Sequence, residues 1–169
     1  MRKIVLTGPE SSGKTTLAES LAEYYQTLWV PEYARFYIEN LGRPYTELDL
    51  LEIAKEQVKQ EDHTAAQISN VLFCDTDLIT IRIWQKEKFK GSFRWINQEI
   101  ENRHYDAYLL CAPDIPWEPD PLRENPDDRE RLYATYEQEL VRLNKKVLKV
   151  SGTIEERLQQ ATSFIDRPM

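Results

Sequence analysis

Residues 8–15, Gly-Pro-Glu-Ser-Ser-Gly-Lys-Thr, have the types and spacing of a loop that binds phosphate groups. Its glycines let the backbone curl so that successive N–H groups converge on one anion. Lys14 would give a positive charge to the outer phosphates of a nucleoside triphosphate, and the Thr15 hydroxyl would be a ligand for Mg²⁺. The nucleotide contacts that we expect are Gly8, Pro9, Glu10, Ser11, Ser12, Gly13, Lys14, Thr15 and Thr16.

The segments on either side of this loop suit the same interpretation. Residues 3–7 are apolar and β-branched, which is typical of a buried strand. Residues 15–28 carry apolar side chains at helical spacing, so that the positive end of a helix would face the bound anion. The alternative is a glycine-containing turn that binds nothing. We expect ATP and Mg²⁺ to bind here, with Lys14 also acting in phosphoryl transfer.

A second group of polar side chains follows the apolar segment 71–74. In proteins with such a loop, an aspartate at the end of a neighbouring strand holds Mg²⁺ directly or through water. We therefore expect Asp75 to be a metal ligand and a catalytic residue, together with Thr15. Asp77, two residues further on, would contact the substrate, although it could equally cap a helix that starts at Leu78.

The turn after residues 28–30 carries three side chains suited to an acceptor substrate. Glu32 would orient a small hydroxyl substrate or accept its proton, so we predict it to be catalytic and substrate-binding. Tyr33 would stack on a planar ring, and Arg35 would bind a phosphate or carboxylate. The alternative is an exposed helix start in which Glu32 occupies the first turn and Tyr33 packs in the core.

Residues 113–126 hold five of the nine prolines and are predicted to be a loop. Asn125 is a suitable N-cap and Pro126 suits the first helical position, so we expect a helix over residues 126–144. Long ordered loops in compact domains often close over a ligand. We therefore expect a lid over residues 113–135.

Three arginines, at 123, 129 and 131, cluster where this loop joins the helix. A lid can deliver a cation to the phosphoryl group as charge develops on it, while excluding water. We expect Arg123 or Arg129 to be catalytic, and Trp117 to contact an aromatic substrate. The alternatives are surface charge balance with the neighbouring acidic residues for the arginines, and packing within the loop for Trp117.

The pattern of elements that must position these residues predicts an α/β fold. Strands separated by helices pair in parallel, because a parallel partner needs a long crossover. We expect the three-layer sandwich of P-loop nucleotide-binding proteins, in one domain over residues 1–169, with a five-stranded, mainly parallel sheet and helices on both faces. The predicted strands are 3–7, 28–30, 71–74, 107–111 and 147–150, and the predicted helices are 15–28, 48–68, 78–88, 126–144 and a last one from 153.

Composition excludes several other classes. The chain has 169 residues, 22 basic and 29 acidic, and a net charge of −7, which argues against non-specific binding to nucleic acid. Two cysteines are too few for a disulfide framework or a four-cysteine zinc site. No apolar run reaches the roughly 20 residues of a membrane span, and no signal peptide is evident. We expect a cytoplasmic protein without membrane insertion, while its oligomeric state stays open.

Four segments together resemble the kinase domain of NadR-type proteins, which are P-loop ribosylnicotinamide kinases. These segments are GPESSGKTTL from residue 8, PEYAR from 31, FCDTDLIT from 73 and the W-x-x-D-x-L-R pattern from 117 to 123. The resemblance runs from residue 3 to about 165. Longer members also carry an adenylyltransferase domain and sometimes a DNA-binding segment, neither of which we expect here.

What the resemblance implies is transfer of the ATP γ-phosphate to the 5′-hydroxyl of nicotinamide riboside. Lys14, Thr15 and Asp75 would then serve ATP and Mg²⁺, and the other predicted residues would surround the substrate or belong to the lid. Two alternatives remain: a kinase for another nucleoside or metabolite, and a regulatory module that binds ATP or NAD with little turnover.

Overall fold

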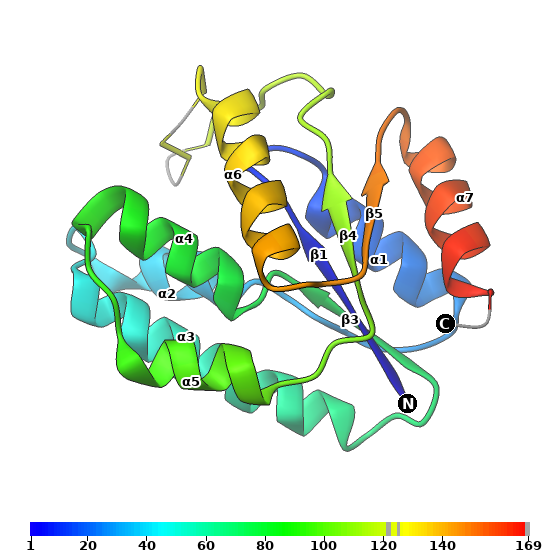
Figure 1. Cartoon of the computed structure of the whole chain (residues 1–169), viewed down its shortest axis with the longest axis horizontal. Coiled ribbons are helices and arrows are strands. Elements are labelled where there is room, and N and C mark those ends of the chain that lie inside the picture. The colour runs from blue at the N-terminus through cyan, green and yellow to red at the C-terminus, as the bar shows by residue number, and fades with distance from the viewer. Residues whose placement is uncertain (121–122, 125, 168–169) are drawn as a thin grey trace.

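A computed structural model describes residues 1–120, 123–124 and 126–167 and shows a sheet covered by helices on both faces (Figure 1). Within that part of the chain the sheet has five strands in the order β2-β3-β1-β4-β5, and every neighbouring pair is parallel. The α/β prediction is confirmed, and the sheet is wholly rather than mainly parallel. The strands are β1 (Arg2–Thr7), β2 (Trp29–Val30), β3 (Val71–Asp75), β4 (Ala107–Cys111) and β5 (Val147–Val150).

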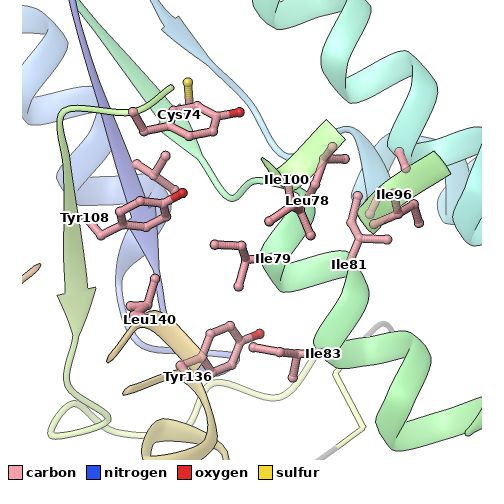
Figure 2. Close-up of a cluster of buried hydrophobic side chains, with 14 of the residues drawn as sticks. Cys74, Leu78, Ile79, Ile81, Ile83, Ile96, Ile100, Tyr108, Tyr136 and Leu140 are labelled. Carbon is pink, nitrogen blue, oxygen red and sulfur yellow. The ribbon is translucent and has the colours of Figure 1, made fainter. Parts of the chain in front are cut away.

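The helices divide into two layers because alternate strand residues point to opposite faces. Ile4 and Leu6 of β1 face α1 and α7, whereas Val5 faces the layer that includes α3, α4, α5 and α6. Figure 2 shows part of this second core, where Tyr136 of α6 lies near Ile83 of α4. The helices are α1 (Lys14–Tyr24), α2 (Tyr33–Leu41), α3 (Glu47–Ala65), α4 (Leu78–Phe89), α5 (Arg94–Asn102), α6 (Arg129–Arg142) and α7 (Ile154–Ile165).

Some predicted boundaries were wrong. The first helix ends at Tyr24 instead of residue 28, since the chain turns at Gln26, whose φ is +50°. Helix α6 begins at Arg129 and not at residue 126, because residues 126–127 form a turn and Asp128 is the N-cap. The predicted cap at Asn125 lies outside the described residues.

Two helices of nine residues each are absent from the predicted list, although the alternative interpretation of the turn at Glu32 was a helix start, and Glu32 is in fact the N-cap of α2. In α2 only Ala34 is fully buried, while Tyr33, Tyr37 and Ile38 are partly buried against the core. Helix α5 buries Ile96 and Ile100 alone. A helix of nine residues makes only about two and a half turns, so its apolar side chains repeat too few times to be distinguished from a loop by sequence alone.

Candidate functional site

The loop between β1 and α1 lies at the carboxyl edge of the sheet, as the motif requires. Gly8 has a φ of +137°, and a Cβ atom there would lie 2.7 Å from the Cys111 carbonyl oxygen. Gly13 has a φ of +78°, so both positions need glycine. The Ser12 hydroxyl donates to the Pro9 carbonyl oxygen over 2.7 Å, which stabilises the curled loop.

The side chain of Lys14 folds back over this loop. Its ammonium donates to the carbonyl oxygens of Gly8 at 3.1 Å and Pro9 at 2.8 Å. The lysine is therefore held at the mouth of the loop, where a phosphate would compete for it. Lys14 also lines a cavity beside this loop, and its contact with a nucleotide stays a prediction.

A cavity of about 400 Å³ opens from the loop toward helices α2, α4 and α6. Residues 8–16, which include all the predicted nucleotide contacts, form one of its walls. Glu32, Arg35 and Arg123, all predicted site residues, also line it. Residues that sequence reasoning did not single out complete the lining: Ala34, Ile38, Tyr45, Trp84, Glu87, Lys88, Ile115, Glu118, Glu124, Leu132 and Tyr136.

Thr15 and Asp75 meet at the inner end of the loop. The Thr15 hydroxyl donates to Asp75 Oδ2 over 2.5 Å. Asp75 is 1% exposed, and its Oδ1 is a buried oxygen without a hydrogen-bond partner. Burial raises the pKa of this carboxyl, although the Lys14 charge and the Thr15 hydroxyl oppose the shift. An unsatisfied carboxylate oxygen beside a hydroxyl fits Mg²⁺, which takes oxygen ligands and keeps several waters or phosphate oxygens.

Glu32 is half-buried and lines the same cavity as the loop. Burial, followed by repulsion from Asp75, raises the pKa of Glu32 to about 7. Lys14 and Arg35 lower it, so the four charges influence one another across the cavity. A carboxyl group with such a pKa holds or releases a proton near neutral pH, which suits a general base.

The side chains of Arg35 and Tyr33, both in the first turn of α2, lie in different surroundings. Arg35 lines the cavity and pairs with Asp120 of the proline-rich loop, at 2.8 Å. The Tyr33 ring instead packs near the rings of Phe36 and Tyr37, and Tyr33 is absent from the cavity lining. The alternative of Tyr33 in the core therefore describes its position better than the predicted stacking on substrate.

Asp77 is buried away from the cavity. One carboxylate oxygen accepts from the backbone N–H groups of Ile79 and Thr80, and the other accepts from the Tyr108 hydroxyl at 2.9 Å. Burial raises its pKa to about 6. The structure gives Asp77 the place of an N-cap for α4, and does not bring it to the predicted substrate position.

The lid residues are divided among several roles. Arg123 lines the cavity, whereas Arg129 donates to the carbonyl oxygens of Ser11 and Ile115 at 3.0 and 2.9 Å. The two guanidinium carbons lie 5.9 and 5.7 Å from the centre of the Trp117 ring. Trp117 therefore lies beside these arginines and does not line the cavity. Of the two predicted catalytic arginines, only Arg123 lines the cavity, so it is the better placed to reach a bound phosphate.

Sequence reasoning missed the aromatic part of the cavity. Trp84 and Tyr136 belong to the apolar stripes of α4 and α6, where they look like ordinary core residues. Tyr45 lies under the Lys88 ammonium, which is 3.8 Å from the ring centre. The sequence offered no signal that these rings, far apart along the chain, would gather around one cavity.

A phosphate-binding loop between the central strand and the first helix, with a carboxylate at the end of the next strand, defines a P-loop nucleotide-binding protein. Comparison with family models agrees, because residues 3–157 match the AAA domain. The chain belongs to this family.

One curated relative and two solved structures show the likeness in more detail. The trifunctional NAD biosynthesis/regulator protein NadR of Escherichia coli is 28% identical over 129 residues, which cover 73% of this chain and 31% of that protein. Structures of NadR with NR, and with NAD and AMP-PNP, superpose with TM-scores of 0.83 and 0.80 at 20% identity. Both cover 99% of this chain, and 52% and 50% of theirs. The predicted resemblance to NadR-type proteins is confirmed.

A third neighbour is more distant and of nearly equal length. Thymidylate kinase from Ehrlichia chaffeensis superposes with a TM-score of 0.68 at 15% identity, covering 98% of each chain. The fold is therefore shared with P-loop kinases, while this chain spans about a third of the curated relative that it matches. Within the described residues, no helix has the length and apolar character needed to cross a membrane.

Proposed function

We propose that this chain is a single-domain, Mg²⁺- and ATP-dependent phosphotransferase that phosphorylates the 5′-hydroxyl of nicotinamide riboside to nicotinamide mononucleotide. One observation carries the proposal: a single cavity is lined both by the phosphate-binding loop and by Glu32 and aromatic rings. Such a cavity can hold a triphosphate and a ring-bearing hydroxyl substrate together. The NadR structure with bound NR supports the choice of acceptor.

Different residues of the chain would bind the phosphates, hold the metal and accept the proton of the acceptor hydroxyl. Backbone N–H groups of residues 8–16 and the Lys14 ammonium would bind the phosphates of ATP. Thr15 and Asp75 would hold Mg²⁺, which when bound neutralises charge on the β- and γ-phosphates. Glu32 would orient the acceptor hydroxyl and accept its proton as the new P–O bond forms and ADP leaves with the electron pair of the broken bond.

The proline-rich connection between β4 and α6 would complete the site as a lid. The Glu118 N–H donates to the Ser11 hydroxyl at 3.1 Å, and the Glu124 N–H donates to the Glu10 carboxylate at 3.0 Å. These contacts bring the connection against the phosphate-binding loop. We propose that Arg123 delivers its charge to the transferred phosphoryl group from there, with the lid including residues 113–135.

The direct test is product formation from ATP and nicotinamide riboside with Mg²⁺ present, followed by chromatography. The proposal expects nicotinamide mononucleotide and ADP in equal amounts. A panel of other nucleosides and nucleotides in the same assay distinguishes the broader kinase alternative. ATP binding without any product from the panel would instead favour a regulatory nucleotide-binding role.

A further inference from the structure

The guanidinium of Arg157 on α7 joins three loops at the carboxyl edge of the sheet. The residue is 2% exposed, and it donates to the carbonyl oxygens of Ser12 at 2.5 Å, Ala112 at 3.0 Å and Gly152 at 3.0 Å. It also pairs with the carboxylate of Asp114, which accepts from the Gly152 N–H at 2.6 Å. One buried cation therefore links the phosphate-binding loop, the start of the proline-rich connection and the loop before α7.

The bond to Ser12 fixes the direction of the peptide group that follows. In a planar trans peptide the carbonyl and the next N–H point in opposite directions. Because Arg157 holds the Ser12 oxygen on the α7 side, the Gly13 N–H points away from α7. Gly13 lines the cavity. A Cβ atom on Gly13 would lie 3.3 Å from Arg157 Nη1, so the guanidinium packs closely against the loop.

We propose that Arg157 is a positioning residue for nucleotide binding. It aims the loop amides at the phosphate and anchors the start of the lid through Asp114. This inference rests on the proposed binding of ATP at the loop. Since Arg157 acts on the phosphate side of the cavity, its loss should weaken nucleotide binding and leave recognition of the acceptor nucleoside unchanged.

The test compares Arg157→Lys and Arg157→Met with the wild type. Lysine keeps the charge but cannot bond several acceptors with one planar fork. Titration calorimetry with AMP-PNP and Mg²⁺ should show a dissociation constant raised roughly tenfold or more for both variants. The KM for nicotinamide riboside should stay within about twofold. Asp114→Asn provides a milder change and should raise the same dissociation constant less.

Arg103→Met is the matched control for a general loss of stability. Arg103 is also largely buried, with 12% of its side chain exposed, and it pairs with Glu61 and Asp62 near the amino ends of the strands. We expect this variant to melt at a lower temperature than the wild type while its affinity for AMP-PNP is unchanged.

The outcomes separate the two proposals. If the wild type binds no AMP-PNP, the proposed function fails and this inference with it. If the wild type binds AMP-PNP and Arg157→Lys binds it equally well, only the inference fails. Should Arg157→Met not fold, Arg157→Lys and Asp114→Asn decide, and equal losses of affinity in Arg103→Met would also overturn the positioning role.

Discussion

The Thr15 hydroxyl donates to the Asp75 carboxylate over 2.5 Å, which joins the first turn of α1 to the end of β3. These residues are 60 positions apart in the sequence, and the parallel pairing of β1 with β3 brings them together. The contact leaves Asp75 Oδ1 without a partner. A buried, half-satisfied carboxylate costs stability unless a ligand satisfies it, so this pair is suited to bind a cation.

Replacing Asp75 by asparagine should separate binding of the metal from binding of the nucleotide. The substitution keeps the size of the side chain and removes its negative charge. We expect Mg²⁺ to increase the affinity for ADP in the wild type, and this increase to fall about 10- to 100-fold in Asp75→Asn. Calorimetric titration of ADP with and without Mg²⁺ measures the difference.

Asp77→Asn is the control two residues further on. Asparagine can still accept from the N–H groups of Ile79 and Thr80, but it cannot reproduce the second carboxylate oxygen that binds Tyr108. We expect the effect of Mg²⁺ on ADP binding to be unchanged, because Asp77 caps α4 and accepts from the Tyr108 hydroxyl away from the cavity. A loss of the Mg²⁺ effect in Asp77→Asn would mean that the metal site has been assigned to the wrong carboxylate.

Lys14→Ala should fold normally and lose phosphoryl transfer. The ammonium is only part-buried, and its bonds run to carbonyl groups of its own loop. Loss of a charge that stabilises the transferred phosphoryl group should lower kcat by roughly 10²- to 10³-fold. Circular dichroism checks the fold and steady-state kinetics the rate. A variant that turns over at the wild-type rate would contradict the site.

The Glu32 carboxyl should titrate near neutral pH in the ligand-free protein. Its pKa is raised to about 7 by burial and by Asp75, while Lys14 lowers it. Asp75→Asn should therefore lower this pKa, and Lys14→Ala should raise it. Carbon-13 NMR of labelled glutamate follows the titration in each variant. A Glu32 resonance that titrates near 4.5 in all three proteins would rule out this coupling.

The same shift predicts how stability changes with pH. The folded-state pKa of about 7 lies above the ordinary value of 4.5, so ionising Glu32 costs folding free energy as the pH rises between these values. Glu32→Gln stays neutral and avoids that cost. Its free energy of unfolding relative to the wild type should rise from pH 4.5 to 7 and level off above, as measured by urea unfolding. A difference that does not change with pH would contradict the raised pKa.

The sequence predicted the sheet well because its strands are short, apolar and separated by helices. The segments at 107–111 and 147–150 coincide with β4 and β5. Short helices were harder, and α2 and α5, with nine residues each, were missed. The start of α6 was placed too early because good capping residues at 125 and 126 do not ensure that the chain turns helical there.

The candidate site was predictable where chemistry is encoded locally. Residues 8–16 form a continuous motif, and a carboxylate at the end of a strand has a known place in such folds. Tyr33 and Trp117 show the limit, because an aromatic side chain near a site can face the cavity or pack beside it. Arg157 shows another, since a lone arginine in an amphipathic helix gives no sign that three distant loops converge on it.

The structure predicts that Arg123, and not Arg131, is the lid arginine that acts in phosphoryl transfer. Arg123 lines the cavity, whereas Arg131 pairs with Asp128 and Glu87, both at 2.6 Å. Arg123→Ala should lower kcat by about 100-fold with a small effect on the KM for ATP, because its charge would matter most as the phosphoryl group transfers. Arg131→Ala should keep kcat within about twofold, since an exposed ion pair contributes little. Steady-state kinetics with saturating acceptor measures both, and the reverse ranking would move the catalytic charge to Arg131.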